Sequence, residues 1–287
     1  MRFWGLTVSL VPMDHDLFYE EGRERDPLQI PEALEQLGAS ASPANPTAVR
    51  LAKVMRKDSD LIGLYTKKEI ARLFNEDFSR RDLPSYPPRI WAWDQSEQTL
   101  LVQIDKRIFV DAESAARAFQ ALLAPKLAAV QLEVRIYPKL TEELFWDMAG
   151  EFAAITEVSF EFVTPNMFGQ TKEAMTAFLK SVRTSTNATV VATKLVNEEG
   201  KLHPKKNGFL TQSLDWIKDG GGKWSIKGRV TRDSRLTSRS SGKQAKIFVL
   251  ADGSTRVDAS NYSANDVVKL IGALRSEYTF KNRDVIK

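Results

Sequence analysis

The feature that most constrains the fold is a strict alternation of apolar and polar residues over positions 130–137. The apolar set is Val130, Leu132, Val134 and Ile136, and the polar set is Gln131, Glu133, Arg135 and Tyr137. Successive side chains of a strand point to opposite faces, so this period of two predicts a strand with one buried and one wet face. Such a strand requires a sheet and a second layer that covers its apolar side.

Strands and helices are predicted in mixed order around this strand, with no internal repeat. Further strands are expected at residues 3–11, 89–93, 99–104, 158–162 and 188–196. Helices are expected at residues 31–37, 47–57, 66–78, 111–123, 141–148, 171–182 and 209–217, and at the C-terminus on an apolar face of Val267, Leu270, Ile271 and Leu274. Three prolines in residues 80–88 predict an irregular segment. The order predicts an α+β fold with mixed sheets and packed helices.

The length of 287 residues suits two subdomains. We place their border near Pro125, which gives an N-terminal α+β subdomain of residues 1–126 and a C-terminal α+β subdomain of residues 127–287. The chain contains no cysteine, which excludes disulfides, zinc–thiolate sites and thiol catalysis. No apolar run is long enough to span a bilayer. We therefore expect a cytoplasmic protein.

Charge is distributed unevenly along the chain. Residues 1–200 hold 23 basic and 29 acidic residues, whereas residues 201–287 hold 18 basic and 8 acidic residues. The excess is concentrated in one segment that contains a single acid, Asp233, and the bases Lys223, Lys227, Arg229, Arg232, Arg235, Arg239, Lys243 and Lys246. A dense positive cluster repels itself unless a polyanion offsets it, and nucleic acid is the commonest such partner.

This segment is predicted to form a basic β-ribbon over residues 223–250. Strand character at 224–230 and 246–251 flanks a Ser- and Arg-rich stretch at 231–243, which we interpret as a long mobile tip. Trp224 is expected to fill the underside of the sheet rather than stack on a base. The predicted nucleic-acid-binding residues are Lys205, Lys206, Lys223, Lys227, Arg229, Arg232, Arg235, Arg239 and Lys243.

No pattern in the sequence predicts catalysis, a cofactor or a metal site. The two histidines, His15 and His203, are far apart, and we interpret them as part of an acidic loop and of a basic surface. A nuclease core places an acid and a lysine on one strand face around Mg²⁺, but Asp105 and Lys106 are adjacent and would point to opposite faces. Phosphate-binding glycine motifs and a nucleophile elbow are absent from the sequence.

The middle of the chain resembles the RexA family of phage exclusion proteins. The resemblance covers residues 82–163: a lead-in (DLPSYPP), a hairpin (RIWAWDQSEQTLLVQIDKRIF), a helix (DAESAARAFQALL), a strand (LEVRIYPKL), a short helix (TEELFWDMAGEF) and a strand (ITEVSFEFVTPN). It is a likeness of element order and apolar pattern, with no shared catalytic motif. The resemblance implies a bacterial or prophage DNA-binding protein of anti-phage defence.

The leading expectation is therefore a non-enzymatic protein that binds nucleic acid, with double-stranded DNA favoured and weak sequence preference. The second hypothesis is an interaction module in which the acidic N-terminal part and the basic C-terminal part are complementary, either between copies in a homo-oligomer such as a dimer or toward a partner protein of a defence system. The third hypothesis is a Mg²⁺-dependent nuclease.

Overall fold

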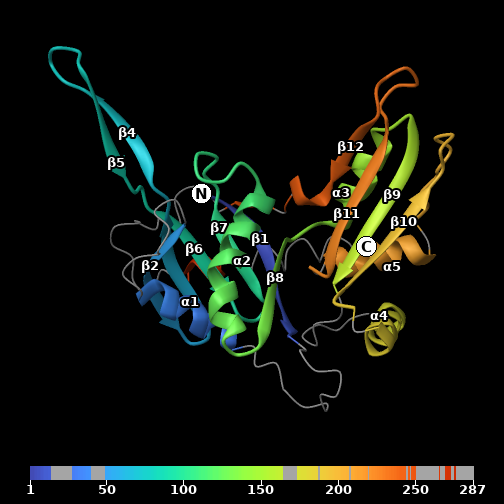
Figure 1. Cartoon of the computed structure of the whole chain (residues 1–287), viewed down its shortest axis with the longest axis horizontal. Helices are drawn as coiled ribbons and strands as arrows, with labels where there is room; N and C mark the ends of the chain where they lie inside the picture. The colour runs from blue at the N-terminus through green and yellow to red at the C-terminus, as the bar shows by residue number, and fades with distance from the viewer. Residues whose placement is uncertain are drawn as a thin grey trace.

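The computed structural model describes most of the chain as two large sheets with helices packed on them, together with a separate two-stranded sheet (Figure 1). The described residues are 1–13, 28–39, 49–163, 173–186, 188–206, 208–218, 220–243, 245, 247–249, 265, 269–272 and 275. All strand pairs are antiparallel in this part, apart from one isolated parallel bridge. The predicted α+β class is confirmed. No helix in these ranges is long and apolar enough to cross a membrane.

The first lobe is built around a long central strand, β1 (Arg2–Pro12). One edge of β1 pairs with β7, while its other edge is shared by β13 at the beginning of the strand and β8 at its end. The sheet order is β13-β1-β7-β6-β3-β2, with β8 joined to β1. The other strands are β2 (Arg50–Lys57), β3 (Asp60–Thr66), β6 (Arg89–Asp94), β7 (Thr99–Gln103), β8 (Leu132–Pro138) and β13 (Ile247–Val249).

Two helices cover one face of this sheet, α1 (Gln29–Ala39) and α2 (Ala112–Ala128). The side chain of Asp111 accepts a hydrogen bond from the Ser114 amide, so it caps α2 as the sequence predicts. Trp91 and Trp93 are fully buried beneath the helices, and the apolar side of β8 faces the same core. The strand predicted from the alternation is therefore confirmed from Leu132 onward, whereas Val130, expected on its buried side, precedes it in a turn and is 44% exposed.

The opposite face of the first sheet is covered from the C-terminus. Phe3 and Phe248 pack there with Leu270 and Ile271, two buried residues of the helical C-terminal segment. The predicted C-terminal helix is confirmed at residues 265, 269–272 and 275, while Val267 and Leu274 of its predicted apolar face lie outside the described residues.

The second lobe is a four-stranded sheet of order β10-β9-β11-β12. Its strands are β9 (Ala154–Val163), β10 (Val190–Val196), β11 (Gly222–Arg229) and β12 (Thr237–Ser240), and its helices are α3 (Glu142–Gly150), α4 (Glu173–Thr186) and α5 (Gly208–Lys218). The core between them is aromatic, with Phe145 edge-on to Trp224 and Phe160 stacked on Phe162. Trp224 is buried, as predicted.

The predicted border near Pro125 does not coincide with the point where the two hydrophobic cores divide. Pro125 lies inside α2, and β8 still belongs to the first sheet. The second core begins at Leu140, so the lobes divide near Lys139, and the chain returns to the first lobe through β13. Helix α2 continues past Pro125 to Ala128, and Leu123 and Leu127 on either side of the proline are buried in the first core.

Two predicted helices, at 47–57 and 66–78, are strands. In β2 the register shifts between Ala52 and Met55 with Lys53 at a φ of 48°, so the bulge converts a two-residue period into apparent helical spacing. The second segment contains β4 (Glu69–Phe74), which pairs with β5 (Arg80–Ser85) as an isolated two-stranded arm. Both faces of this arm lack a covering layer among the described residues, so no alternation marks it.

An ion pair fastens the C-terminal segment to the first sheet. The Arg275 guanidinium donates to Asp94 at 2.6 Å and to Asp60 at 3.0 Å. Burial alone would raise the pKa of Asp94, but hydrogen bonds from Arg275 and Ser96 hold that pKa below its ordinary value. Burial raises the pKa of Asp60 despite the Gln95 amide and Arg275. Asp94 is therefore the carboxylate that Arg275 stabilises more strongly.

Replacing Arg275 with alanine should lower the free energy of unfolding by about 1–3 kcal/mol at pH 7, because the buried Asp94 carboxylate loses its charged partner. Because the pKa of Asp94 is lowered by folding, this stabilisation is present above the ordinary carboxyl pKa and is lost as the pH falls through the lowered one. Urea titrations of both proteins, followed by tryptophan fluorescence, measure the difference. If the difference in free energy of unfolding between the two proteins stays constant as the pH falls through the carboxyl range, Asp94 is not the group that Arg275 stabilises.

Candidate nucleic-acid interface

The basic ribbon is shorter than predicted and has a different return strand. β11 pairs with β12, from Ser225 opposite Ser240 to Gly228 opposite Thr237. The predicted return strand at 246–251 instead contributes β13 to the first sheet, where Ile247 lies opposite Trp4. The sequence did not predict β12 as a strand, because this edge strand is polar and therefore lacks the apolar alternation typical of a strand. It pairs with β11 in the four-stranded sheet.

The tip of the ribbon, residues 227–236, is a compact turn rather than a long loop. The Ser234 amide donates to the Thr231 carbonyl at 3.1 Å, and the Thr231 amide donates to the Ser234 hydroxyl at 3.0 Å. Arg229 adds a hydrogen bond from its guanidinium to the Ser234 carbonyl. The tip therefore has its shape before any ligand binds. In Figure 1 it extends beyond the helices of the second lobe.

Four cations are exposed on this tip: Lys227, Arg229, Arg232 and Arg235. Asp233 is the one acid between them in sequence. Within the described ranges, Arg232 and Arg235 make no ion pair with a carboxylate. Their charge is therefore available to an external anion.

Two other predicted residues of the ribbon are neutralised by neighbouring acids. Lys223 lies 3.1 Å from Glu161 on β9, and Arg239 lies 3.4 Å from Glu151 at the end of α3. Lys223 is six residues from Arg229 on the same strand, which is roughly 20 Å at the rise of an extended chain. Lys223 is therefore remote from the tip, whereas Arg239, opposite Ile226, lies next to it but has Glu151 as an ion-pair partner.

A third set of predicted residues lies between β10 and α5. Ile155 of β9 pairs through its backbone with Lys201 on one side and with Gly228 of the ribbon on the other. The segment that follows β10 therefore begins at the same end of the sheet as the ribbon tip. Lys205 and Lys206 follow it and are exposed, and the Lys206 ammonium lies 5.5 Å above the Trp146 ring of α3. Lys201, which the sequence analysis did not select, forms an ion pair with Glu199.

Two basic residues of the segment cannot be placed. Lys243 belongs to a short 3₁₀ helix, η1 (Ser241–Lys243), but its side chain lies outside the described part of the chain. Lys246 also lies outside it. The candidate interface therefore consists of the ribbon tip, while Lys206 lies beside Trp146 of α3.

The acids that a nuclease would use are already paired. Asp105 accepts hydrogen bonds from Arg107 and Arg89, which lower its pKa strongly. Asp94 is held by Arg275. Among the described residues, no group of three or more histidine and carboxylate side chains could hold a metal ion. His15 and its acidic neighbours lie outside these ranges, and His203 is exposed beside the basic segment.

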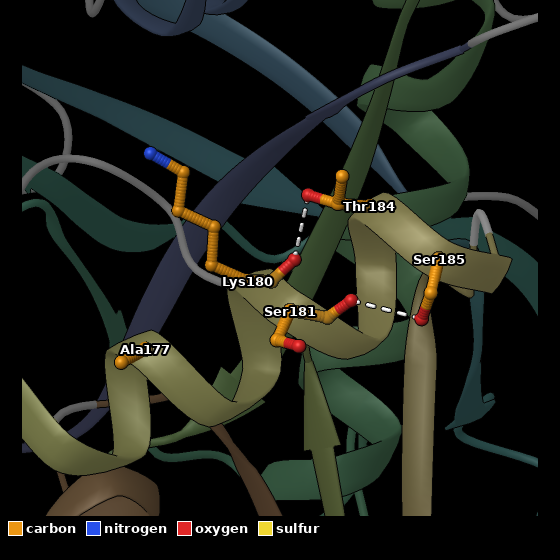
Figure 2. Close-up of a pocket in the computed structure, with 5 residues that line it drawn as sticks. All are labelled: Ala177, Lys180, Ser181, Thr184 and Ser185. Atoms are coloured by element: carbon orange, nitrogen blue, oxygen red, sulfur yellow. Dashed lines mark hydrogen bonds between the residues drawn. The ribbon is translucent and has the colours of Figure 1, made fainter.

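A shallow hollow on α4 also has two hydroxyl groups that are not placed to bind a ligand. Figure 2 shows Lys180, Thr184 and Ser185 along it, with Ala177 and Ser181. The Thr184 hydroxyl donates to the Lys180 carbonyl and the Ser185 hydroxyl to the Ser181 carbonyl, each at 2.9 Å. Because both hydroxyl hydrogens are bound within the helix, they are poorly placed to serve a ligand.

Comparison with known proteins adds no relative to this picture: no family model matches the chain, and no curated protein matches its sequence. The likeness of residues 82–163 to the RexA family therefore stays a prediction, and the candidate interface rests on its own geometry.

Proposed function

We propose that this chain is a non-enzymatic nucleic-acid-binding protein, with double-stranded DNA as the favoured ligand, and that the ribbon tip carries the contact. The observation that supports this most is the group of exposed arginines on a preformed hairpin. Arginine forms strong, bidentate hydrogen bonds with phosphate oxygens. A turn that is ordered in advance also avoids part of the entropy cost of binding.

The shape of the ribbon favours a duplex over a single strand. The major groove of B-DNA admits a two-stranded β-ribbon. Proteins that bind single strands usually present aromatic platforms for the bases. The one aromatic residue of the ribbon, Trp224, is buried in the core of the second lobe. The contacts of the ribbon with DNA would therefore come from arginine, lysine, serine and threonine side chains to the sugar–phosphate backbone. Because such contacts carry no sequence information, we expect weak sequence preference.

The biological setting that we propose is anti-phage defence in the bacterial cytoplasm, encoded by the host or a prophage. This part rests on the RexA-like pattern of residues 82–163 and on the absence of cysteine, which suits a reducing compartment. Plaque counts on cells that express the wild-type chain should fall relative to cells with an empty vector. Equal plaque counts across a broad panel of phages would contradict the proposed role in defence and would leave the proposal of DNA binding unaffected.

Duplex binding should weaken steeply with salt. If four tip cations each neutralise one phosphate, the affinity should drop roughly 100-fold between about 50 and 200 mM salt. Fluorescence anisotropy with a labelled 20-base-pair duplex of arbitrary sequence measures this dependence. An affinity that changes little over this range would contradict phosphate contacts by the tip.

The ribbon offers a matched pair of charge deletions. Changing Arg232 and Arg235 to alanine should lower the salt slope by about two and weaken binding at low salt at least tenfold, because two phosphate contacts are lost. Changing Lys223 and Arg239 to alanine removes the same charge from the ribbon, but these side chains already have carboxylate partners, so the slope should stay near the wild-type value. Equal losses in the two variants would show that net charge, and not the tip, determines binding.

A further inference from the structure

The β4–β5 arm is the second hairpin that projects from the molecule. Figure 1 shows it leaving the first lobe as a long ribbon, and among the described residues its strands contact chiefly each other. An isolated two-stranded hairpin is marginally stable in water. The arm nevertheless exposes Ile70, Leu73 and Phe74, the last at 67%. Such exposed apolar area on a thin projection is typical of an interaction surface.

The turn at the end of the arm holds an aromatic side chain outward. Phe78 is 88% exposed and has a φ of 60°, which is unusual for a bulky residue. Its amide donates to the Asn75 carbonyl at 3.0 Å, and the Asp77 carboxylate accepts hydrogen bonds from the Ser79 amide and hydroxyl. Strained backbone of this kind persists where neighbouring contacts determine it and is common at binding sites. The turn thus fixes the backbone position from which the aromatic side chain of Phe78 projects.

The residues directly before this aromatic side chain are acidic. Glu76 and Asp77 precede Phe78, whereas the bases lie behind the turn on the two strands: Arg80 is bound by Asp82 at 2.6 Å, and Arg72 and Arg81 are exposed. The two acids at the turn would repel phosphates there. The turn suits a protein surface that is apolar and basic.

The ribbon tip of this same chain is such a surface. Val230 and Leu236 are exposed there, at 40% and 47%, and flank Arg232 and Arg235 in the sequence. Apolar side chains would meet apolar side chains, the acids of the turn would meet the two arginines, and a guanidinium could lie on the face of Phe78.

Two copies can satisfy both hairpins at once. The arm and the ribbon tip project from the same edge of the molecule, from opposite lobes, and diverge (Figure 1). A chain therefore does not join its own arm to its own ribbon. A two-fold axis beyond that edge, perpendicular to the view, would place the arm of each copy against the ribbon tip of the other. Such an arrangement is closed and uses each contact twice.

We infer that the β4–β5 arm of one copy docks on the ribbon tip of a second copy, and reciprocally, to form a two-fold dimer. This inference goes beyond the proposed function and does not depend on it. The dimer occupies Arg232 and Arg235, so the arm and nucleic acid exclude each other at the tip.

Light scattering on a sizing column tests the dimer with full-length, nuclease-treated protein at about 50 mM salt, where charge contacts are weakly screened. The wild type should have twice the mass of one chain. The arm variant Glu76→Arg/Asp77→Arg and the ribbon variant Arg232→Glu/Arg235→Glu should each have the mass of one chain, because each places like charges in both contacts. The control Glu143→Arg/Asp147→Arg, which reverses two exposed acids of α3, should remain dimeric.

Mixing the arm and ribbon variants gives the decisive result. In the mixed pair one contact is wild type and the other has both charges reversed, so both are attractive and the dimer mass should return. Phe78→Ala should also halve the mass, with an unchanged thermal unfolding curve because its side chain is exposed. A monomeric wild type, dimeric single-surface variants or a mixture that stays monomeric would each overturn the inference. DNA binding is measured separately by anisotropy, with the arm variant, whose ribbon tip is unchanged, so failure of the dimer and failure of the proposed function give different results.

Discussion

The arrangement of the first lobe depends on the hydrogen bonding of β1 along both of its edges. β7 occupies one edge, and the other is divided between β13 at Arg2–Trp4 and β8 at Leu6–Pro12. This division brings the strand that leads to the second lobe and the strand that returns from it to the same edge. The lobes also approach at β1: a Cβ on Gly220, which has a φ of 86°, would lie 2.3 Å from Thr7. Only glycine allows that contact without strain.

Pairing across the second sheet decides which basic residues remain available. β9 places Glu157 and Glu161 on the outer face, where they meet Lys194 of β10 and Lys223 of β11. These contacts turn part of the basic segment into an ordinary ion-paired sheet face. Beyond Arg229, which is the last ribbon residue paired with β9, the described part of the chain offers the hairpin no neighbouring strand, so Arg232 and Arg235 have no carboxylate partner there. The accessible positive charge therefore reflects the end of strand pairing more than composition.

Local pattern predicted the elements with an uninterrupted apolar or alternating pattern. Strands β6, β7 and β8, the helix capped by Asp111 and the burial of Trp224 agree with the sequence analysis, although β8 begins at Leu132 and not at Val130. The failures are elements without a single buried face or with an interrupted period. The bulge at Lys53 interrupts the alternation of β2, so this strand was predicted as a helix. The edge strand β12 is polar and was predicted as part of a loop, and β4 of the arm has no buried face to give an alternation. The candidate interface was correspondingly found in part: the tip arginines were selected, but Lys223 and Arg239 were selected with them.

The sequence by itself determined the α+β class, the periods of most elements and the concentration of bases near the C-terminus, because each depends on residues close together along the chain. Only the tertiary structure decided that β12 rather than β13 completes the ribbon, that Arg275 pairs with Asp60 and Asp94, and that Arg232 and Arg235 stay unpaired within the described residues. The reason is that the partner of a strand and the counterion of a charged side chain come from residues distant in sequence. Arg275 and Asp94, for example, are about 180 positions apart, and local pattern carries no information about such a pair.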